Sequence, residues 1–184
     1  MPNAVILRPS IVFGAEDQFF NRFANMSRLG PILPLVGAET QFQPVFVDDL
    51  AEAAVLGATG AAAAGIYELA GPESDSFRGL MLRMLNVIQR RRLVVGIQTF
   101  VARIMAASFE LGHKLTFGIA PLALTRDQVR SLSVDNVPTG KCLNFSDLGI
   151  EATAMESVLS EYLWPFRVSG QYADIKASAK NLKT

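Results

Sequence analysis

The order of apolar segments along the chain is the feature that most limits its possible folds. Short runs of aliphatic and aromatic residues occur at 4–7, 11–13, 45–47 and 66–70, and only Glu68 interrupts them. Such runs are typical of strands buried on both faces of a parallel sheet. Segments with helical spacing lie between them, so the chain is expected to have an α/β fold.

Two helices have clear predicted boundaries. Ser76 is expected to cap a helix whose apolar residues fall on one stripe. Asp17 is expected to cap a shorter helix that stops at Gly30. A strand at 93–95 and a helix at 100–111 should follow. Further helix starts are expected where a side chain can accept hydrogen bonds from free amides: Asp48 or Asp49, and capping boxes at Thr125 and Thr153.

The composition argues against several classes of function. Seventeen basic and seventeen acidic residues cancel, which leaves no electrostatic footprint for nucleic acid. The single cysteine, Cys142, allows no internal disulfide, and one histidine, His113, leaves too few ligands for a zinc site. Cys142 is expected to be a buried apolar group and His113 a surface or capping residue, so neither a catalytic nor a metal site is predicted.

The longest apolar stretch, at 93–111, is not expected to cross a membrane, because Gln98, Thr99 and Arg103 interrupt it. The residues after Met1 show no basic region followed by an apolar one, so no signal peptide is predicted. A cytoplasmic location follows from these two expectations.

Three segments together resemble one protein family. The sequence Leu-Arg-Pro-Ser-Ile-Val-Phe-Gly at 7–14 is similar to a strand of extended short-chain dehydrogenase/reductase proteins, the NAD-dependent epimerase/dehydratase superfamily. The segments at 43–51 and 66–71 resemble two later elements of the same family, in family order and at family spacing. This resemblance implies a Rossmann-type fold that binds NAD or NADP.

The resemblance also implies candidate site residues. Cofactor-binding residues would be those at the end of the first strand, which edge the nicotinamide pocket in the family: Pro9, Ser10, Ile11 and Val12. Substrate-pocket residues would be Phe20, Asn21 and Gln43. Sugar epimerases often carry an arginine near Gln43 that grips a phosphate, so its absence argues against a nucleotide-sugar substrate.

Other segments narrow the resemblance. Those at 16–23, 124–129, 135–137 and 162–167 look like bacterial relatives of the nucleotide-binding accessory subunit of respiratory complex I. In that family the dinucleotide serves structure rather than turnover. The resemblance implies respiratory NADH dehydrogenase subunits as partners and a peripheral association with the inner membrane. It covers residues 1–168, and 169–184 are expected to form a loose polar tail.

The sequence lacks the glycine-rich turn that holds a dinucleotide pyrophosphate between a first strand and its helix. Gly57, Gly60 and Gly65 follow a helix and precede a strand, which is the wrong order. A Tyr-x-x-x-Lys at Tyr172 and Lys176 lies in the tail, where the family has no catalytic pair. We therefore expect a truncated protein: a partial Rossmann-type parallel sheet edge plus a mostly helical substrate-side lobe, binding no cofactor without its nucleotide-binding half.

Three functions stay open from the sequence. The first is an accessory or assembly subunit of a complex-I-like NADH dehydrogenase that does not turn over a substrate. The second is the substrate half of an NAD(P)-dependent reductase or epimerase. The third is an interaction module without a nucleotide.

Overall fold

The computed structural model describes residues 4–98, 100–101 and 126–168 of the 184-residue chain. The strands of this part are β1 (Val5–Pro9), β2 (Val12–Phe13), β3 (Ile32–Val36), β4 (Gln41–Phe42), β5 (Val45–Phe46), β6 (Gly65–Leu69), β7 (Asp75–Ser76) and β8 (Leu93–Ile97). The helices are α1 (Phe20–Leu29), α2 (Val47–Thr59), α3 (Phe77–Val87), α5 (Arg126–Ser131) and α6 (Met155–Tyr162), with 3-10 helices η1 (Phe145–Leu148) and η2 (Trp164–Phe166). Strands and helices alternate, so the predicted α/β class is confirmed.

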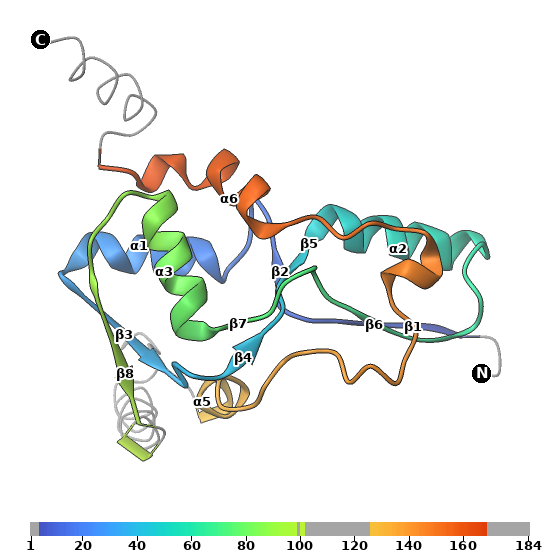
Figure 1. Cartoon of the computed structure of the whole chain (residues 1–184), viewed down its shortest axis with the longest axis horizontal. Coiled ribbons are helices and arrows are strands. Elements are labelled where there is room, and N and C mark those ends of the chain that lie inside the picture. Colours follow the sequence, from blue (N-terminus) through green and yellow to red (C-terminus); the bar gives the residue numbers. More distant parts are fainter. Residues whose placement is uncertain (1–3, 99, 102–125, 169–184) are drawn as a thin grey trace, which may run out of the picture.

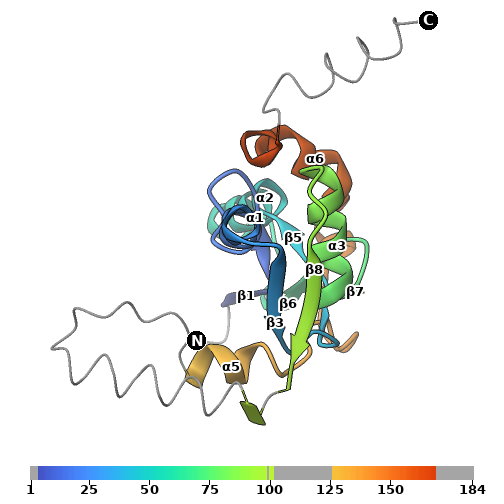
Figure 2. The same cartoon turned by 90° about the vertical axis from the view of Figure 1, so that its left-hand side faces the viewer.

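The described strands form four pairs. β1 pairs with β6, β2 with β5 and β3 with β8, all in parallel, and β4 pairs with β7 in the antiparallel sense. Figure 1 shows an arm of β1, β6 and α2 at the right and a lobe of α1, α3, α6, β3 and β8 at the left. Figure 2, turned by 90°, shows β3 and β8 side by side on the face of the lobe.

The arm depends on the parallel pair of β1 and β6. The Ser10 amide donates to the Leu69 carbonyl (2.9 Å) and the Gly65 amide to the Ala4 carbonyl (3.1 Å). Because backbone groups alternate in direction along a strand, the amides of Val5 and Leu7 point away from β6. β6 is paired on its other edge by Leu143, whereas among the described residues β1 pairs only with β6.

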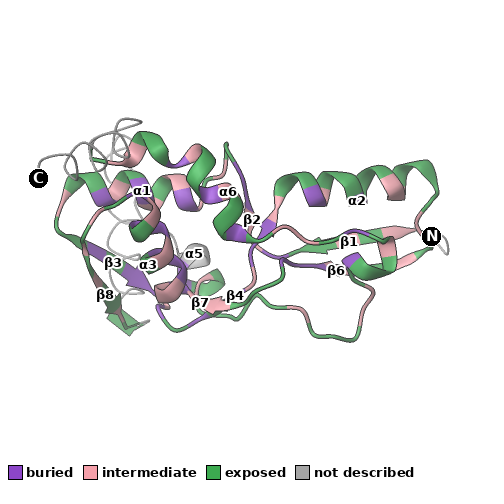
Figure 3. Cartoon of the chain, turned by 45° about the horizontal axis from the view of Figure 1, so that its top comes forward, coloured by how far each residue is buried: buried purple, intermediate pink, exposed green. Residues whose placement is uncertain are grey.

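The lobe contains the larger core of the described residues. Figure 3 shows buried residues on the inner sides of α1, α3 and β3, where the lobe elements face one another. Phe77 has no exposed surface, and its ring centroid lies 5.2–5.7 Å from those of Phe19, Phe23 and Phe42. Ring contacts at such distances add to the apolar burial that stabilises the lobe.

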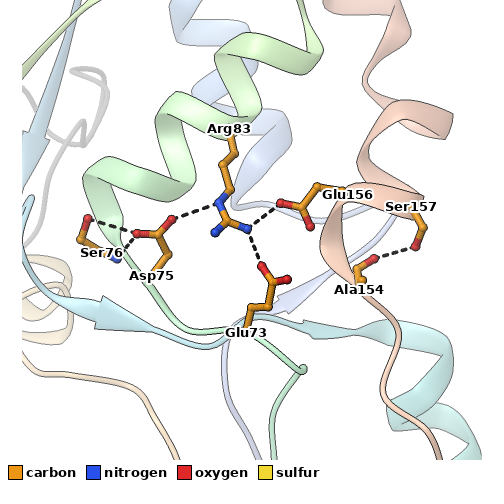
Figure 4. Close-up of polar contacts among 7 residues, drawn as sticks. All are labelled: Glu73, Asp75, Ser76, Arg83, Ala154, Glu156 and Ser157. Atoms are coloured by element: carbon orange, nitrogen blue, oxygen red, sulfur yellow. Dashed lines mark hydrogen bonds and ion pairs between the residues drawn. The ribbon is translucent and has the colours of Figure 1, made fainter.

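A charged cluster ties α3 to α6 at the surface of the lobe. The Arg83 guanidinium bridges Glu73 (2.6 Å), Asp75 (3.0 Å) and Glu156, as Figure 4 shows. The hydrogen bond to Glu73 is the main reason that the pKa of Arg83 is raised. One cation therefore pairs with three carboxylates, and its contact with Glu156 holds the start of α6 against α3.

The expected cap at Ser76 agrees with the structure, and the one at Asp17 does not. The Ser76 hydroxyl accepts a hydrogen bond from the Gly79 amide (3.0 Å) and caps α3. The Asp17 carboxylate accepts the Asn21 amide (3.1 Å) in the first turn of α1, although Phe19 occupies the cap position. The strand expected at 93–95 is confirmed as part of β8.

Two other expectations were wrong. Neither Asp48 nor Asp49 caps α2, and Thr153 does not cap α6. Instead, Asp49 is buried and accepts two hydrogen bonds from Thr153, one from its amide (2.7 Å) and one from its hydroxyl (2.8 Å). The capping groups are used in a long-range contact, which local sequence patterns do not reveal.

β3 was not anticipated, because prolines at 31 and 34 argue against a strand. The strand forms because its Leu33, Leu35 and Val36 side chains are buried in the lobe while β8 pairs with it in parallel. Several expectations lie outside the described residues: the helix start at Thr125, most of the helix at 100–111, His113, and the tail with Tyr172 and Lys176.

The apolar stretch at 93–111 begins with β8, so its first residues are strand. Within the described ranges, none of the helices is both long and apolar enough to cross a membrane.

Removing the Phe77 ring tests the role of the aromatic contacts in the lobe. Phe77→Ala should lower the free energy of unfolding by about 3–5 kcal/mol, because it leaves a cavity in a fully buried position. Leu82→Ala on the same helix is the control, and it should change stability by less than about 0.5 kcal/mol since Leu82 is 51% exposed. Chemical denaturation of both variants gives the comparison, and equal losses would contradict a core centred on Phe77.

Candidate functional site

A pocket of about 250 Å³ lies where β1 and β6 end. Arg8, Pro9 and Ser10 line it from β1, Glu68 and Leu69 from β6, and residues 135–139 close it from the opposite side. Both strands run in parallel, so their carboxyl ends meet at this edge. Parallel α/β sheets bind their ligands at this edge, which makes the pocket the candidate site.

The segment at 135–139 reaches the pocket through hydrogen bonds to β1 and β4. The Ser10 hydroxyl donates to the Asn136 carbonyl (2.9 Å), and the Asn136 amide donates to the Gln41 carbonyl (2.8 Å). The Gln41 amide in turn donates to the Asp135 carboxylate (2.9 Å). The backbone of Asn136 and the carboxylate of Asp135 are therefore held by contacts within the protein.

Glu68 is one of two carboxylate residues that line the pocket, the other being Asp135. Glu68 accepts hydrogen bonds from the amide (2.6 Å) and hydroxyl (2.8 Å) of Thr139, and Arg8 lies 3.8 Å away. The Thr139 amide is the main cause that holds the pKa of Glu68 below its usual value of 4.5, with the Thr139 hydroxyl second. The lowered pKa makes the Glu68 carboxylate a weak base at neutral pH. An ionised carboxylate of this kind suits an anchor for the Thr139 turn.

The four residues predicted to bind a cofactor divide into two pairs. Pro9 and Ser10 line the pocket. Ile11 and Val12 lie behind it, where the Ile11 carbonyl accepts the Val45 amide (2.9 Å) and Val12 pairs with Val45 in the β2–β5 ladder. Cofactor binding by these four residues stays a prediction, and Pro9 and Ser10 have the location it requires.

None of the three predicted substrate-pocket residues lines this pocket, and Asn21 lines a separate cavity of about 430 Å³. Phe20 is completely buried in the lobe core. The Asn21 side-chain amide donates to the carbonyls of Ala15 (3.0 Å) and Asp17 (3.1 Å), and that of Gln43 donates to the Gly71 carbonyl (2.6 Å). The structure thus gives each a packing or hydrogen-bonding role, and substrate binding by them stays a prediction.

The sequence did not reveal that Glu68 and residues 135–139 belong to one site. These segments are 71 positions apart at the Thr139–Glu68 hydrogen bond, so no periodicity connects them. The turn residues Pro138 and Gly140 were the only local signal of a loop there. Within the described chain, no group of three or more His, Cys, Asp or Glu side chains could hold a metal ion.

No protein-family model matches the chain. Several curated relatives carry the name "NADH dehydrogenase [ubiquinone] 1 alpha subcomplex subunit 9, mitochondrial". The chain is 30% identical to that of Arabidopsis thaliana over 175 residues, which are 92% of the chain and 44% of the relative. It is 31% identical to that of Mus musculus over 160 residues, 84% of the chain and 40% of the relative. The chain spans less than half the length of these two relatives.

Solved structures with a similar fold include the Thermus thermophilus UDP-glucose 4-epimerase in complex with NAD. It has 15% sequence identity and a TM-score of 0.55, and the match covers 91% of this chain and 47% of that one. The human epimerase family protein SDR39U1 with NADPH has 15% sequence identity and a TM-score of 0.59, and the match covers 86% of this chain and 48% of that one. At these identities the likeness concerns the fold, and it agrees with the Rossmann-type expectation.

The contacts of Glu68 predict a pH-dependent contribution to stability. Because its folded pKa is depressed, this contribution is present above the unfolded value near 4.5 and is lost as the pH falls through the lower folded pKa. Glu68→Gln should therefore be less stable than the wild type at neutral pH, and the difference should narrow below pH 4.5. Urea denaturation across this window measures it, and a difference that does not vary with pH would contradict the ionised anchor.

Proposed function

We propose, from the premise that this chain is similar in sequence to NADH dehydrogenase subunits and in fold to epimerase-type proteins, that it acts in an accessory or assembly subunit of an NADH dehydrogenase of the complex I type. The observation that carries the proposal is the sequence likeness. It extends over 92% of the chain to a protein named as a subunit of that enzyme. A role in assembly would make NADH dehydrogenase subunits the partners of this chain.

The pocket supports a binding role without turnover. Proton transfer needs a side chain that is free to exchange a proton with the ligand. The Ser10 hydroxyl is occupied by the Asn136 carbonyl, and the Glu68 carboxylate is occupied by Thr139 and Arg8. These groups hold one wall of the site in place, which suits a nucleotide retained as a structural element.

The edge of β1 suggests how the site would be completed. Val5 and Leu7 direct their amides away from β6, and Pro9, which has no amide hydrogen, faces the same side. An apolar strand with such an edge can accept a further parallel strand. We propose that this strand belongs to the nucleotide-binding half of the family fold, which would bring the phosphate cradle of NAD or NADP to the pocket formed by Pro9 and Ser10.

Co-purification tests the proposed partner. An affinity-tagged chain expressed in a respiring bacterium should be recovered from detergent extracts together with NADH dehydrogenase subunits, and both should co-migrate on native gels. A tagged Phe77→Ala variant is the control, because disruption of the lobe core should abolish recovery. Recovery of the chain without any dehydrogenase subunit from a host that contains its natural enzyme would contradict the proposal.

Cofactor titration tests the proposed division of the site. The purified chain should show no saturable binding of NADH or NADPH by fluorescence, since the pocket supplies a wall and not a phosphate cradle. After addition of a nucleotide-binding half from a relative, binding should appear and should weaken when Ser10 is replaced by a larger residue, as in Ser10→Leu. Tight binding of either nucleotide to the chain alone would refute this arrangement.

A further inference from the structure

Arginines gather at the end of the lobe where α1 and α3 finish. Arg28 lies in the last turn of α1, and Arg90, Arg91 and Arg92 follow α3. Arg28 and Arg92 are close enough to Arg90 to lower its pKa, together with the larger effect of burial. Arg90, Arg91 and Arg92 are consecutive, and Arg92 bonds to the backbone of Ser27 next to Arg28, so the four cations lie at one end of the lobe, which we call the arginine end.

Backbone contacts fix the position of this group. The Arg92 guanidinium donates to the Ser27 carbonyl (2.6 Å) near the end of α1, and Arg90 donates to the Phe166 carbonyl (2.7 Å) in η2. Cations near helix C-termini stabilise the helix dipole. Arg28, in the last turn of α1, also has this role, but the side chains of Arg28 and Arg91 are exposed and make no hydrogen bond or ion pair within the described residues.

The arginine end has an excess of positive charge. The ion pairs formed among the described residues involve Arg8, Arg78 and Arg83, and none involves a member of the arginine end. Since the whole chain has a net charge of zero, this local excess is a property of one surface. Such a surface attracts an anionic partner.

Exposed aliphatic side chains lie beside these cations. Leu29, next to Arg28, is 89% exposed, and Leu93, next to Arg92, is 64% exposed. Ile32 is opposite Leu93 in the β3–β8 ladder and is 52% exposed. Figure 2 shows this side of the lobe toward the viewer, with the end of α1 and the β3–β8 pair facing outward.

A second cavity of about 430 Å³ borders this end. Leu29, Met26 and Phe166 give it apolar walls, and Asn25 and Arg22 add polar groups. Leu29 belongs to the cavity and to the exposed aliphatic row, and Arg90 bonds to the Phe166 backbone. The cavity therefore adjoins the arginine end and could receive an apolar chain whose charged head meets the arginines.

We propose that the arginine end docks the protein on a bilayer that contains anionic phospholipid. The guanidinium groups would contact phosphates, which they bind well, while Leu29, Ile32 and Leu93 would enter the interface between head groups and acyl chains. This deepens the proposed function, because it names the surface by which an accessory subunit would face the respiratory membrane. The docking proposal rests on the proposed function only in naming the respiratory membrane as the bilayer.

A bilayer fits these residues better than an acidic protein surface does. Side chains as exposed as Leu29 and Leu93 would need matching hollows on a protein partner, whereas a lipid interface accepts protruding aliphatic groups of any arrangement. Arginines with adjacent aliphatic residues are also the composition typical of peripheral membrane surfaces.

Vesicle sedimentation tests the proposal with the purified chain alone, so its result does not depend on a dehydrogenase partner. The chain should sediment with vesicles of phosphatidylcholine and phosphatidylglycerol, and not with phosphatidylcholine alone, and binding should weaken as salt increases. Arg28→Gln with Arg91→Gln should reduce binding about tenfold or more, because two cations leave the surface. The matched control is Arg130→Gln with Lys141→Gln, which removes two exposed cations elsewhere and should leave binding unchanged.

A second pair of variants tests the apolar contribution. Leu29→Ser should weaken vesicle binding several-fold while its salt dependence persists, whereas Val55→Ser, at a 59% exposed position on α2, should have no effect. Circular dichroism of each variant checks that the fold is retained. Absence of binding to anionic vesicles, or equal losses in the arginine variant and its control, would overturn the proposal and would leave an acidic protein as the partner of this surface.

Discussion

The parallel pairing of β1 with β6 is the interaction on which the rest of the site depends. It brings the carboxyl ends of both strands to one edge, where Pro9, Ser10 and Glu68 meet. The Thr139 turn closes the pocket because its amide and hydroxyl bind the Glu68 carboxylate. The same pairing leaves the Val5 and Leu7 amides on the far side of β1, with no partner among the described residues, and this edge links the pocket to the proposed nucleotide-binding half.

The lobe and the arm have different physical roles. The lobe has a core closed by the Phe77 ring contacts and by the Arg83 cluster that ties α3 to α6. The arm has a smaller core around Tyr67 and Leu69, and β1 is exposed on one edge. We infer that the lobe maintains the shape of the protein and carries the arginine end, whereas the arm provides the surfaces that join it to other parts of an assembly.

Patterns along the sequence predicted elements whose stability is local. The apolar run before Pro9 and the Ser76 cap both gave correct positions, because an apolar strand and a capped helix are recognisable within a few residues. The expected burial of this strand on both faces was wrong, since none of the residues of β1 is buried. The predictions failed where a distant partner decides the outcome. Asp49 bonds Thr153 and not its own helix, and β3 forms despite Pro34 because β8 pairs with it. The wall at 135–139 was missed for the same reason, since its contact with Glu68 joins residues 71 positions apart in the sequence.

Amide hydrogen exchange of the isolated chain measures the open edge of β1 residue by residue. The amides of Ile6 and Arg8, which by alternation face β6, should exchange slowly, and those of Val5 and Leu7 should exchange at nearly the rate of unstructured peptide. Addition of a nucleotide-binding half should then slow the exchange of the Val5 and Leu7 amides. Equal protection of all four amides in the isolated chain would contradict the account.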